Sequence, residues 1–361
     1  MRTLDSHDES VGSEASVGGE RIREISVVIV SWRDADQVEA CVRELMSARR
    51  EIAAGGPRVS LCVVDNGGGL LDRAPDLSGM PDVRVIVNES NRGLAGAANQ
   101  AAAAARGDVL LFLNPDTRPE GDAFTPIARA FETHGEAVAV APRLLDMNSA
   151  TPASRRLAAP DQEDQFTFQL RRLPTLASDA RQLLLIDHLL PNNSGRRADR
   201  YADVDREKAF AVEQAAGAAL AVRRAAFAAV GGFDERFFPA WFEDVDLCAR
   251  LGRRGEILYW PGSCFRHIGG VSSRVLGYDR FLPIYYRNAL RYRQRYPRGA
   301  RALYRALLVL GMLLRLIAAP IRPSLPRSRA ESARAYWRTL GVALGLPSRA
   351  MDAGSPRSPQ R

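Results

Sequence analysis

The sequence has few cysteines, few histidines and no long apolar segment. Of its 361 residues, four are cysteine and four are histidine, and no two cysteines have Cys-x-x-Cys spacing. Cys41, Cys62, Cys248 and Cys264 each lie among apolar neighbours, which favours buried free thiols in a reducing compartment over zinc ligands or disulfides. No apolar run reaches the roughly 20 residues that a membrane-spanning helix needs.

A secretory signal and a dinucleotide-binding turn are also missing. Residues 1–19 are polar and acidic and lack an apolar core, so we predict a disordered leader over residues 1–22 and a cytoplasmic protein. The glycines after the early strand that ends at Asp65 do not form Gly-x-Gly-x-x-Gly, which argues against a nicotinamide or flavin enzyme.

Positive charge is concentrated near the end of the chain. The formal net charge is +8, but the segment from Arg280 to Arg361 holds 17 arginines and two acids, so this segment carries +15 and the remainder −7. A basic region of this kind suggests an anionic partner. No helix-turn-helix, zinc-finger or RNA-binding signature accompanies it, so we expect an anionic membrane surface and no nucleic acid.

Strands and helices alternate through the first 150 residues. Apolar runs predict strands over 25–32, 59–64, 83–87, 109–113 and 137–142, and helical spacing predicts helices over 34–50, 91–106 and 121–133. This order predicts an α/β fold with a mostly parallel sheet, right-handed crossovers and flanking helices. The hydrophobic content of 46% is typical of a globular core.

Polar side chains stand at the ends of three predicted strands. They are Ser31, Asp65 with Asn66, and Asp116 after Pro115. Because the carboxyl ends of parallel strands share one edge of a sheet, we expect these groups to converge on one crevice, where such sheets bind nucleotides. A lone carboxylate beside a phosphate suits Mg²⁺, which takes few protein ligands. The alternative at Asp65 and Asp116 is an ordinary turn with a capping acid.

A group of acids lies among aromatic residues later in the chain. Glu243, Asp244 and Asp246 open a predicted helix directly after the aromatic-rich segment 237–242. The helix dipole stabilises acids in a first turn, which is the purely structural interpretation. Apolar surroundings also raise a carboxyl pKa and produce a usable base, which is the interpretation that we favour. His267, followed closely by two glycines, is a candidate contact for phosphate or metal.

The remaining segments are less regular. Residues 151–212 are predicted to form a loop-rich excursion with a helix near 175–190, which covers the crevice, contacts the acceptor or is simply solvated. Residues 281–322 are basic and amphipathic, and we expect them to lie on anionic lipid, with packing against the catalytic domain as the alternative. Residues 323–361 are rich in Pro, Ser and Arg and are expected to be partly disordered.

Seven short stretches, in this order and spacing, resemble the family-2 glycosyltransferases of the GT-A fold. They are Val28–Trp32, Val63–Gly67, Asn91–Asn99, Leu113–Asp116, Gly231–Glu235, Phe242–Leu247 and His267–Ser272. The resemblance runs from about Ile25 to Tyr296 and is nearest to bacterial rhamnosyltransferase-like enzymes. It implies a GT-A catalytic domain over residues 23–280, followed by the basic helical extension.

The resemblance also implies a role for each matched residue. The residues implied to bind the nucleotide sugar are Ser31, Asp65, Asn66, Asn91, Gly93, Asn99 and Asn114. Asp116 and His267 are implied to hold a divalent metal, Mg²⁺ or Mn²⁺. Asp244 resembles the general base, Glu243 and Asp246 are its neighbours, and Asp234 and Trp241 are assigned to acceptor binding.

The implied function is inverting transfer of a sugar, with rhamnose favoured, from a dTDP- or UDP-sugar to a hydroxyl of a glycan or lipid-linked acceptor. We therefore expect a peripheral enzyme on the inner face of the plasma membrane, in cell-wall or polysaccharide synthesis. The alternatives are a nucleotidyltransferase and a non-catalytic nucleotide-sugar-binding protein of the same fold. A nucleotidyltransferase normally has a Gly- and Lys-rich phosphate loop, which is missing here, and the joint presence of Asp116, Asp244 and His267 argues against a non-catalytic protein.

Overall fold

The computed structural model describes residues 19–147, 165–269, 276–318 and 328–346. Within these residues one nine-stranded sheet has the strand order β3-β2-β1-β4-β10-β6-β11-β5, with β8 paired to β11. Its strands are β1 (Glu24–Ser31), β2 (Arg58–Asp65), β3 (Val83–Val87), β4 (Val109–Leu113), β5 (Thr117–Pro119), β6 (Ala137–Asp146), β8 (Phe210–Val212), β10 (Ala219–Arg223) and β11 (Glu256–His267). A separate two-stranded ribbon joins β7 (Leu170–Arg171) and β9 (Gln214–Ala215).

The first half of the sheet is parallel and confirms the predicted α/β fold. β1 pairs in parallel with β2 and β4, and β2 pairs in parallel with β3. β10 then lies antiparallel between β4 and β6, which reverses the strand direction at that point. β6 and β11 are parallel to each other, so the antiparallel strands are confined to the second half of the sheet.

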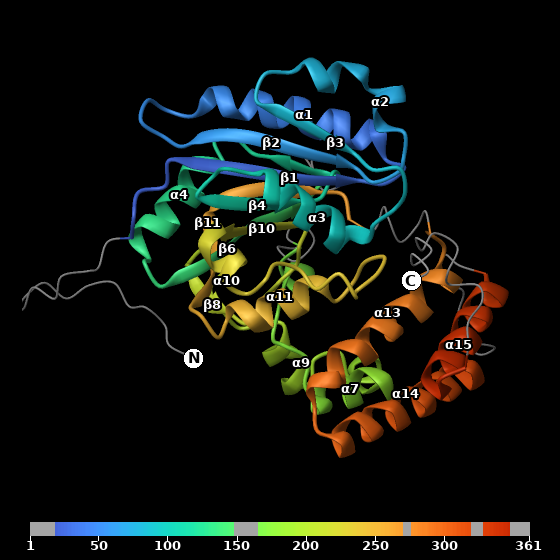
Figure 1. Cartoon of the computed structure of the whole chain (residues 1–361). Helices are drawn as coiled ribbons and strands as arrows, with labels where there is room; N and C mark the ends of the chain where they lie inside the picture. The colour runs from blue at the N-terminus through green and yellow to red at the C-terminus, as the bar shows by residue number, and fades with distance from the viewer. Residues whose placement is uncertain (1–18, 148–164, 270–275, 319–327, 347–361) are drawn as a thin grey trace, which may run out of the picture.

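Helices cover both faces of the sheet (Figure 1). They are α1 (Ala35–Ala48), α2 (Leu70–Arg73), α3 (Gly93–Ala104), α4 (Phe124–Thr133), α10 (Arg224–Ala229) and α11 (Glu243–Leu251). Along β1, Val27 and Ile29 join the same core cluster as Leu45 of α1, while Val28 joins the cluster that contains Ala97 of α3. The alternation follows from the two-residue period of a strand, and it explains why these strands are apolar at nearly every position.

The excursion contains only short elements between residues 165 and 212. They are α6 (Phe166–Gln169), α7 (Leu176–Leu183), α8 (Ile186–Leu189) and α9 (Ser194–Asp199). The predicted helix near 175–190 is thus split in two at Leu185, which has a left-handed backbone (φ 65°). The first part of the excursion, residues 151–164, lies outside the described residues.

Three helices follow the sheet and pack together beside it (Figure 1). They are α13 (Tyr278–Tyr292), α14 (Arg298–Ala318) and α15 (Arg329–Leu344), with a 3-10 turn over Arg293–Arg295. Tyr304, Leu308 and Met312 of α14 share one core cluster with Leu183 of α7 and Ala335 of α15. We call α7, α13, α14 and α15 the C-terminal helical layer. One face of α14 therefore packs on other helices of the protein. Packing was the alternative prediction for the basic residues 281–322.

Two boundary predictions need correction. The tail prediction for residues 323–361 did not include α15, which forms because Ala335, Tyr336, Leu340 and Ala343 recur at helical spacing and are buried. Residues 19–22 of the predicted disordered leader are packed, because Ile22 is apolar and buried and the Gly19 N–H donates to the carbonyl of Glu132 in α4. The remainder of both segments lies outside the described residues.

Candidate active site

The strand-end residues of β1 and β2 lie side by side. Ser31 is the register partner of Asp65, and both are buried. The two carboxylate oxygens of Asp65 accept hydrogen bonds from the N–H groups of Gly68 and Leu70 at 2.8 and 2.7 Å. The Ser31 hydroxyl donates to Asp34 at 2.8 Å. Asp65 thus fixes the loop after β2, and its assignment to the donor base stays a prediction.

Asn66 organises the loop that starts α3. Its amide nitrogen donates to the side-chain oxygen of Asn91 and to the carbonyl of Gly93, and its amide oxygen accepts from the N–H of Arg92. Gly93 has φ +76°, and a Cβ there would meet the ring of Phe238 at 2.8 Å. Asn66, Asn91 and Gly93 therefore shape the loop before α3 and place it against the segment that leads to Asp244.

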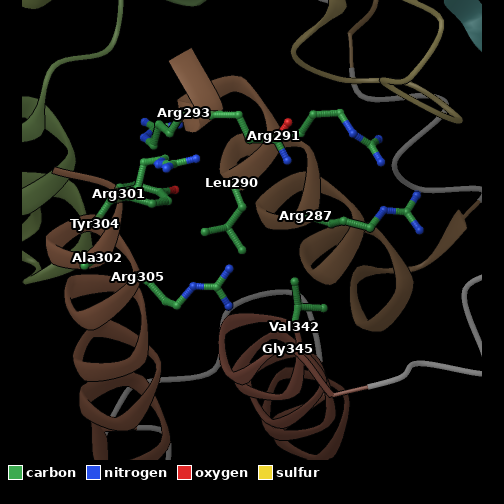
Figure 2. Close-up of a pocket in the computed structure, with 11 residues that line it drawn as sticks. Arg287, Leu290, Arg291, Arg293, Arg301, Ala302, Tyr304, Arg305, Val342 and Gly345 are labelled. Carbon is green, nitrogen blue, oxygen red and sulfur yellow. The ribbon is translucent and has the colours of Figure 1, made fainter. Parts of the chain in front are cut away.

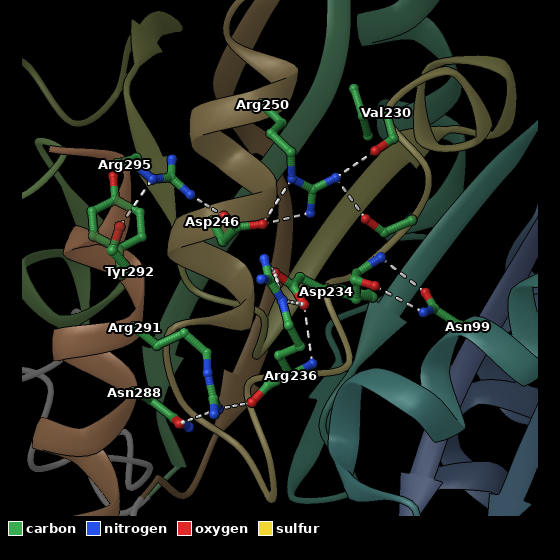
Figure 3. A network of polar contacts seen from close by, with 12 residues as sticks. Asn99, Val230, Asp234, Arg236, Asp246, Arg250, Asn288, Arg291, Tyr292 and Arg295 are labelled. Atoms are coloured by element: carbon green, nitrogen blue, oxygen red, sulfur yellow. Dashed lines mark hydrogen bonds and ion pairs between the residues drawn. The ribbon is translucent and has the colours of Figure 1, made fainter. Parts of the chain in front are cut away.

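Asn99 holds the turn over residues 233–235, far from it in the sequence (Figure 3). Its amide exchanges two hydrogen bonds with the backbone of Phe233, at 2.8 and 2.9 Å, and donates to Glu235 at 3.1 Å. In the same turn Asp234 forms an ion pair with Arg236, and this hydrogen bond lowers the pKa of Asp234. The structure gives Asn99 and Asp234 positioning contacts, and their assigned ligand roles are untested.

Asp116 and His267 meet because β5 and β11 pair. His267 is the register partner of Thr117, the residue after Asp116, and its Nε2 lies 3.3 Å from Asp116 Oδ1. Its Nδ1 lies 2.6 Å from Oε1 of Gln165, whose amide nitrogen donates to the His267 carbonyl. Because that oxygen can only accept, Nδ1 carries a proton, and Nε2 is the ring nitrogen that faces the carboxylate.

The Asp116–His267 pair has the chemistry of a cation site. A lone pair facing a carboxylate repels it unless a proton or a metal lies between them, and metal-binding histidines usually donate their other N–H to a fixed acceptor. Burial alone would raise the pKa of Asp116, yet His267 and the N–H of Gly269 lower it. No cluster of three or more His, Cys, Asp or Glu side chains suited to a metal occurs in the described part of the chain. The pair fits a hard divalent ion whose other ligands are water and phosphate.

Asp34 is a neighbour of this pair that sequence reasoning missed. Burial raises its pKa, hydrogen bonds from Ser31 and the N–H of Trp32 oppose the rise, and the charge of Asp116 adds to it. Its position just before α1 is ordinary for a helix cap, so nothing in the sequence distinguished it.

Asp244 lies in the first turn of α11 and is held by two backbone groups. Oδ2 accepts from the N–H of Gly217 at 3.1 Å and Oδ1 from the N–H of Val245 at 2.7 Å. Burial raises the pKa of Asp244, as the aromatic surroundings predicted. Burial and the Asp244 charge also raise the pKa of Glu243, whose Oε2 is buried without a partner among the described residues.

A two-residue segment connects Asp244 to the end of β4. Gly217 contacts Asp244, and the carbonyl of the next residue, Ala218, accepts from the N–H of Asn114 at 3.0 Å and the hydroxyl of Thr117 at 3.3 Å. One short backbone link thus contacts the predicted base at one residue and, at the next, the segment over 114–117 that contains Asp116.

Asp246 and Trp241 connect α11 to the C-terminal helical layer. Asp246 forms ion pairs with Arg250 of its own helix, at 2.7 Å, and with Arg295 beyond α13 (Figure 3). The Trp241 ring packs edge-on against Phe281 at 4.8 Å between ring centroids. Asp246 is thus a structural neighbour of Asp244, and the acceptor role of Trp241 stays a prediction.

The excursion supplies site residues that the sequence did not single out. Phe168 stacks on His267 at 5.8 Å between centroids, and the guanidinium of Arg171 lies over the Phe168 ring at 5.9 Å. The charge of Arg171 also acts on Asp244, opposing the rise of its pKa. Arg171 Nε is buried with no partner in the described regions. Such contacts depend on tertiary folding, and arginines scattered through a loop gave no signal.

Comparisons with known proteins identify the family to which the sequence is similar. A family model described as glycosyl transferase family 2 matches residues 26–197. The chain carries a family-2 glycosyltransferase domain. This glycosyltransferase is 28% identical over 257 residues to N-acetylglucosaminyl-diphospho-decaprenol L-rhamnosyltransferase of Mycobacterium tuberculosis, covering 67% of this chain and 75% of the relative.

A solved structure supports the fold of the glycosyltransferase. The mannosyltransferase PcManGT from Pyrobaculum calidifontis, in complex with GDP-Man and Mn²⁺, aligns with a TM-score of 0.50 over 91% of this chain and 89% of that chain, at 12% identity. The GT-A fold predicted from the sequence is therefore confirmed.

Proposed function

We propose that the protein transfers a sugar, with rhamnose favoured, from a nucleoside diphosphate donor to a hydroxyl of a lipid-linked glycan, with inversion at the anomeric carbon. The observation that carries this proposal is the backbone link at Gly217 and Ala218, which joins Asp244 to Asn114 and Thr117, on either side of Asp116. The name of the mycobacterial relative supports the favoured sugar and the class of acceptor.

Asp116 and His267 are the residues that would hold a divalent metal, Mg²⁺ or Mn²⁺. Such an ion, when bound, stabilises negative charge on a departing diphosphate. The Mn²⁺ in the mannosyltransferase structure supports this part of the proposal. Arg171, next to the pair through Phe168, adds a second positive charge for the diphosphate.

Asp244 acts as the general base. Its carboxylate takes the proton of the acceptor hydroxyl, and the freed oxygen attacks the anomeric carbon from the face opposite the diphosphate. A new C–O bond forms as the bond to the diphosphate breaks, so the configuration inverts. The N–H groups of Gly217 and Val245 hold the carboxylate in place, and its raised pKa makes it a stronger base than an ordinary aspartate.

We also propose that α14 attaches the enzyme to an anionic membrane surface. Leu303, Leu310, Leu313 and Ile317 are exposed and recur every three to seven residues, so they form one outward stripe on the helix opposite its buried face. None of the helices in the described regions is long and apolar enough to cross a bilayer. Arginines at both ends of the stripe suit anionic headgroups.

The stripe is tested by vesicle flotation of Leu310→Glu/Ile317→Glu, using 80% phosphatidylcholine and 20% phosphatidylglycerol. We expect the variant to lose flotation, because burying two leucine-sized side chains in the bilayer contributes roughly 3 kcal/mol or more to the binding free energy. Ala330→Glu/Ala333→Glu adds the same charge elsewhere on exposed or half-exposed helix positions and is expected to float. Unchanged flotation of the stripe variant would rule out this attachment.

The donor proposal is tested by thermal shift with dTDP-rhamnose, UDP-glucose and GDP-mannose, each with Mg²⁺, Mn²⁺ or EDTA. A donor at 100 times its Kd adds about 2.7 kcal/mol to the stability, so a clear rise in Tm is expected for dTDP-rhamnose with metal. Asp116→Asn is expected to abolish the metal-dependent part of the rise. A protein that no nucleotide sugar stabilises would contradict the proposal.

A further inference from the structure

The C-terminal helical layer contains a cavity of about 520 Å³ that is remote in sequence from the site described above. It lies between α13, α14 and α15 (Figure 2). Among the described residues five arginines line it, and no aspartate or glutamate does: Arg287, Arg291, Arg293, Arg301 and Arg305. A concave surface that gathers five guanidinium groups and no carboxylate has the composition of a polyanion site.

Two of these arginines, Arg301 and Arg305, have no carboxylate partner among the described residues. Arg293 forms a buried ion pair with Asp179 and stacks on Tyr304 at 3.9 Å, so it belongs to the framework of the pocket. Arg305 donates to the carbonyl of Ala343 at 2.7 Å, a contact that orients the guanidinium without cancelling its charge. The Arg301 guanidinium has no hydrogen-bond or ion-pair partner in the described parts of the chain.

The pocket is also lined by apolar residues and opens beside exposed ones. Leu290 of α13 and Val342 of α15 point into it from opposite sides, and the guanidinium of Arg305 enters from α14 (Figure 2). Gly345 at its edge lies between Leu344 and Leu346, which are 58% and 60% exposed. Apolar surroundings do not stabilise a bound inorganic anion, whereas a phospholipid presents a phosphate attached to apolar chains that can contact them.

We propose that this arginine pocket binds the phosphate of an anionic phospholipid headgroup. This proposal rests on the membrane attachment of α14 proposed above and adds a specific site to it. Leu344 and Leu346, beside the pocket, would enter the acyl region, while Arg301 and Arg305 would bind the phosphate at the level of the headgroups.

The test compares two matched alanine substitutions that place one acid on an exposed helix position. Ala302→Glu puts the acid in the pocket, and Ala330→Glu puts it on α15 away from the pocket. Binding is measured by flotation of the full chain with vesicles of pure phosphatidylcholine and of phosphatidylcholine with 20% phosphatidylglycerol. Ala302→Glu is expected to lower the partition coefficient on the anionic vesicles about tenfold, and Ala330→Glu by less than about threefold.

A second pair removes charge. Arg301→Gln/Arg305→Gln is expected to lose about 20-fold in partition coefficient, whereas the control Arg329→Gln/Arg334→Gln, exposed arginines of the same region, loses much less. Tm values within about 2 °C of wild type show that the pocket variants are folded. Equal losses in variant and control would mean diffuse attraction of the basic region and would overturn the pocket proposal.

Two further outcomes separate the sources of the phosphate. Calorimetric binding of inorganic pyrophosphate that Ala302→Glu abolishes, with vesicle binding unchanged, would identify a soluble anion and refute the lipid site. Loss of flotation in Leu310→Glu/Ile317→Glu with the pocket variants unaffected would leave the stripe standing and refute the pocket alone.

Discussion

Buried carboxylates in this enzyme fall into two groups according to what their oxygens contact. The oxygens of Asp65 accept backbone N–H groups, and those of Asp246 bind two arginines, so both side chains fix the backbone. Asp116 faces Nε2 of His267, and Asp244 and Glu243 have raised pKa values. Residues of the second group retain the capacity to bind a cation or a proton, which is why we assign the chemistry to them.

Glu243→Gln is expected to change stability in a pH-dependent way. Because the folded protein raises the pKa of Glu243, the stability that its protonated form provides is fully present below the unfolded pKa, about 4.3, and is lost as pH rises through the folded pKa. Glutamine mimics the protonated acid, so the variant should gain Tm relative to wild type at pH 8 and gain less at pH 5. An equal difference in Tm at both pH values would refute a raised pKa of the buried Glu243 carboxyl.

Arg171→Met is expected to reduce turnover about 100-fold, because a positive charge beside the leaving diphosphate is lost. The control is Arg172→Met, since Arg172 is the next residue and its side chain is about half exposed (45%). Steady-state rates at saturating donor and acceptor provide the comparison. Similar rates for the two variants would exclude Arg171 from the site.

At the scale of elements, the sequence predicts best where burial is uniform. The apolar runs at β1, β2 and β4 identified those strands almost to the residue, because each strand is covered on both faces, and the run at β3 identified an edge strand that is only partly buried. The site was harder to predict. Gln165 and Arg171 reach it only because β7 pairs with β9 and α6 packs under His267, contacts that leave no local pattern. α15 was missed because the Pro-, Ser- and Arg-rich composition of the tail over 323–361 hid a buried helical face.

The loop before α3 gives a prediction at this scale. Gly93→Ala is expected to destabilise the protein by about 1–2 kcal/mol or more, because φ is +76° and the new Cβ would overlap the Phe238 ring. Gly341→Ala, inside α15 with open space around its Cβ position, should instead stabilise by about 0.5–1 kcal/mol. Chemical denaturation measures both values. A neutral Gly93→Ala would contradict the described loop.

Across the whole molecule, a buried ion pair holds α13 to α7, which belongs both to the excursion and to the C-terminal helical layer. Arg293, after α13, binds Asp179 of α7 through two nitrogens, and both side chains are nearly inaccessible to solvent. The excursion in turn contributes Gln165 and Arg171 to the active site. The layer with the proposed membrane surface and the catalytic crevice are therefore joined through one segment.

Asp179→Asn is expected to destabilise the enzyme by about 3–5 kcal/mol, because it leaves the Arg293 guanidinium buried without a counter-charge. Thermal unfolding measures the loss, and limited proteolysis should cut first in the C-terminal helical layer. Asp187→Asn is the control, since its contact with Arg181 is longer, at 3.5 Å, and more exposed. Equal stability of the two variants would mean that the buried pair does not hold the layer.

We propose above all that Asp244 deprotonates the acceptor beside Asp116 and His267, which would hold the divalent metal for the donor diphosphate. The most direct measurement is turnover of Asp244→Asn together with its affinity for the donor. We predict a fall in turnover of about 10³-fold, with the donor Kd within about threefold of wild type, because the base is lost and the donor site is intact. Turnover near the wild-type rate would contradict the account.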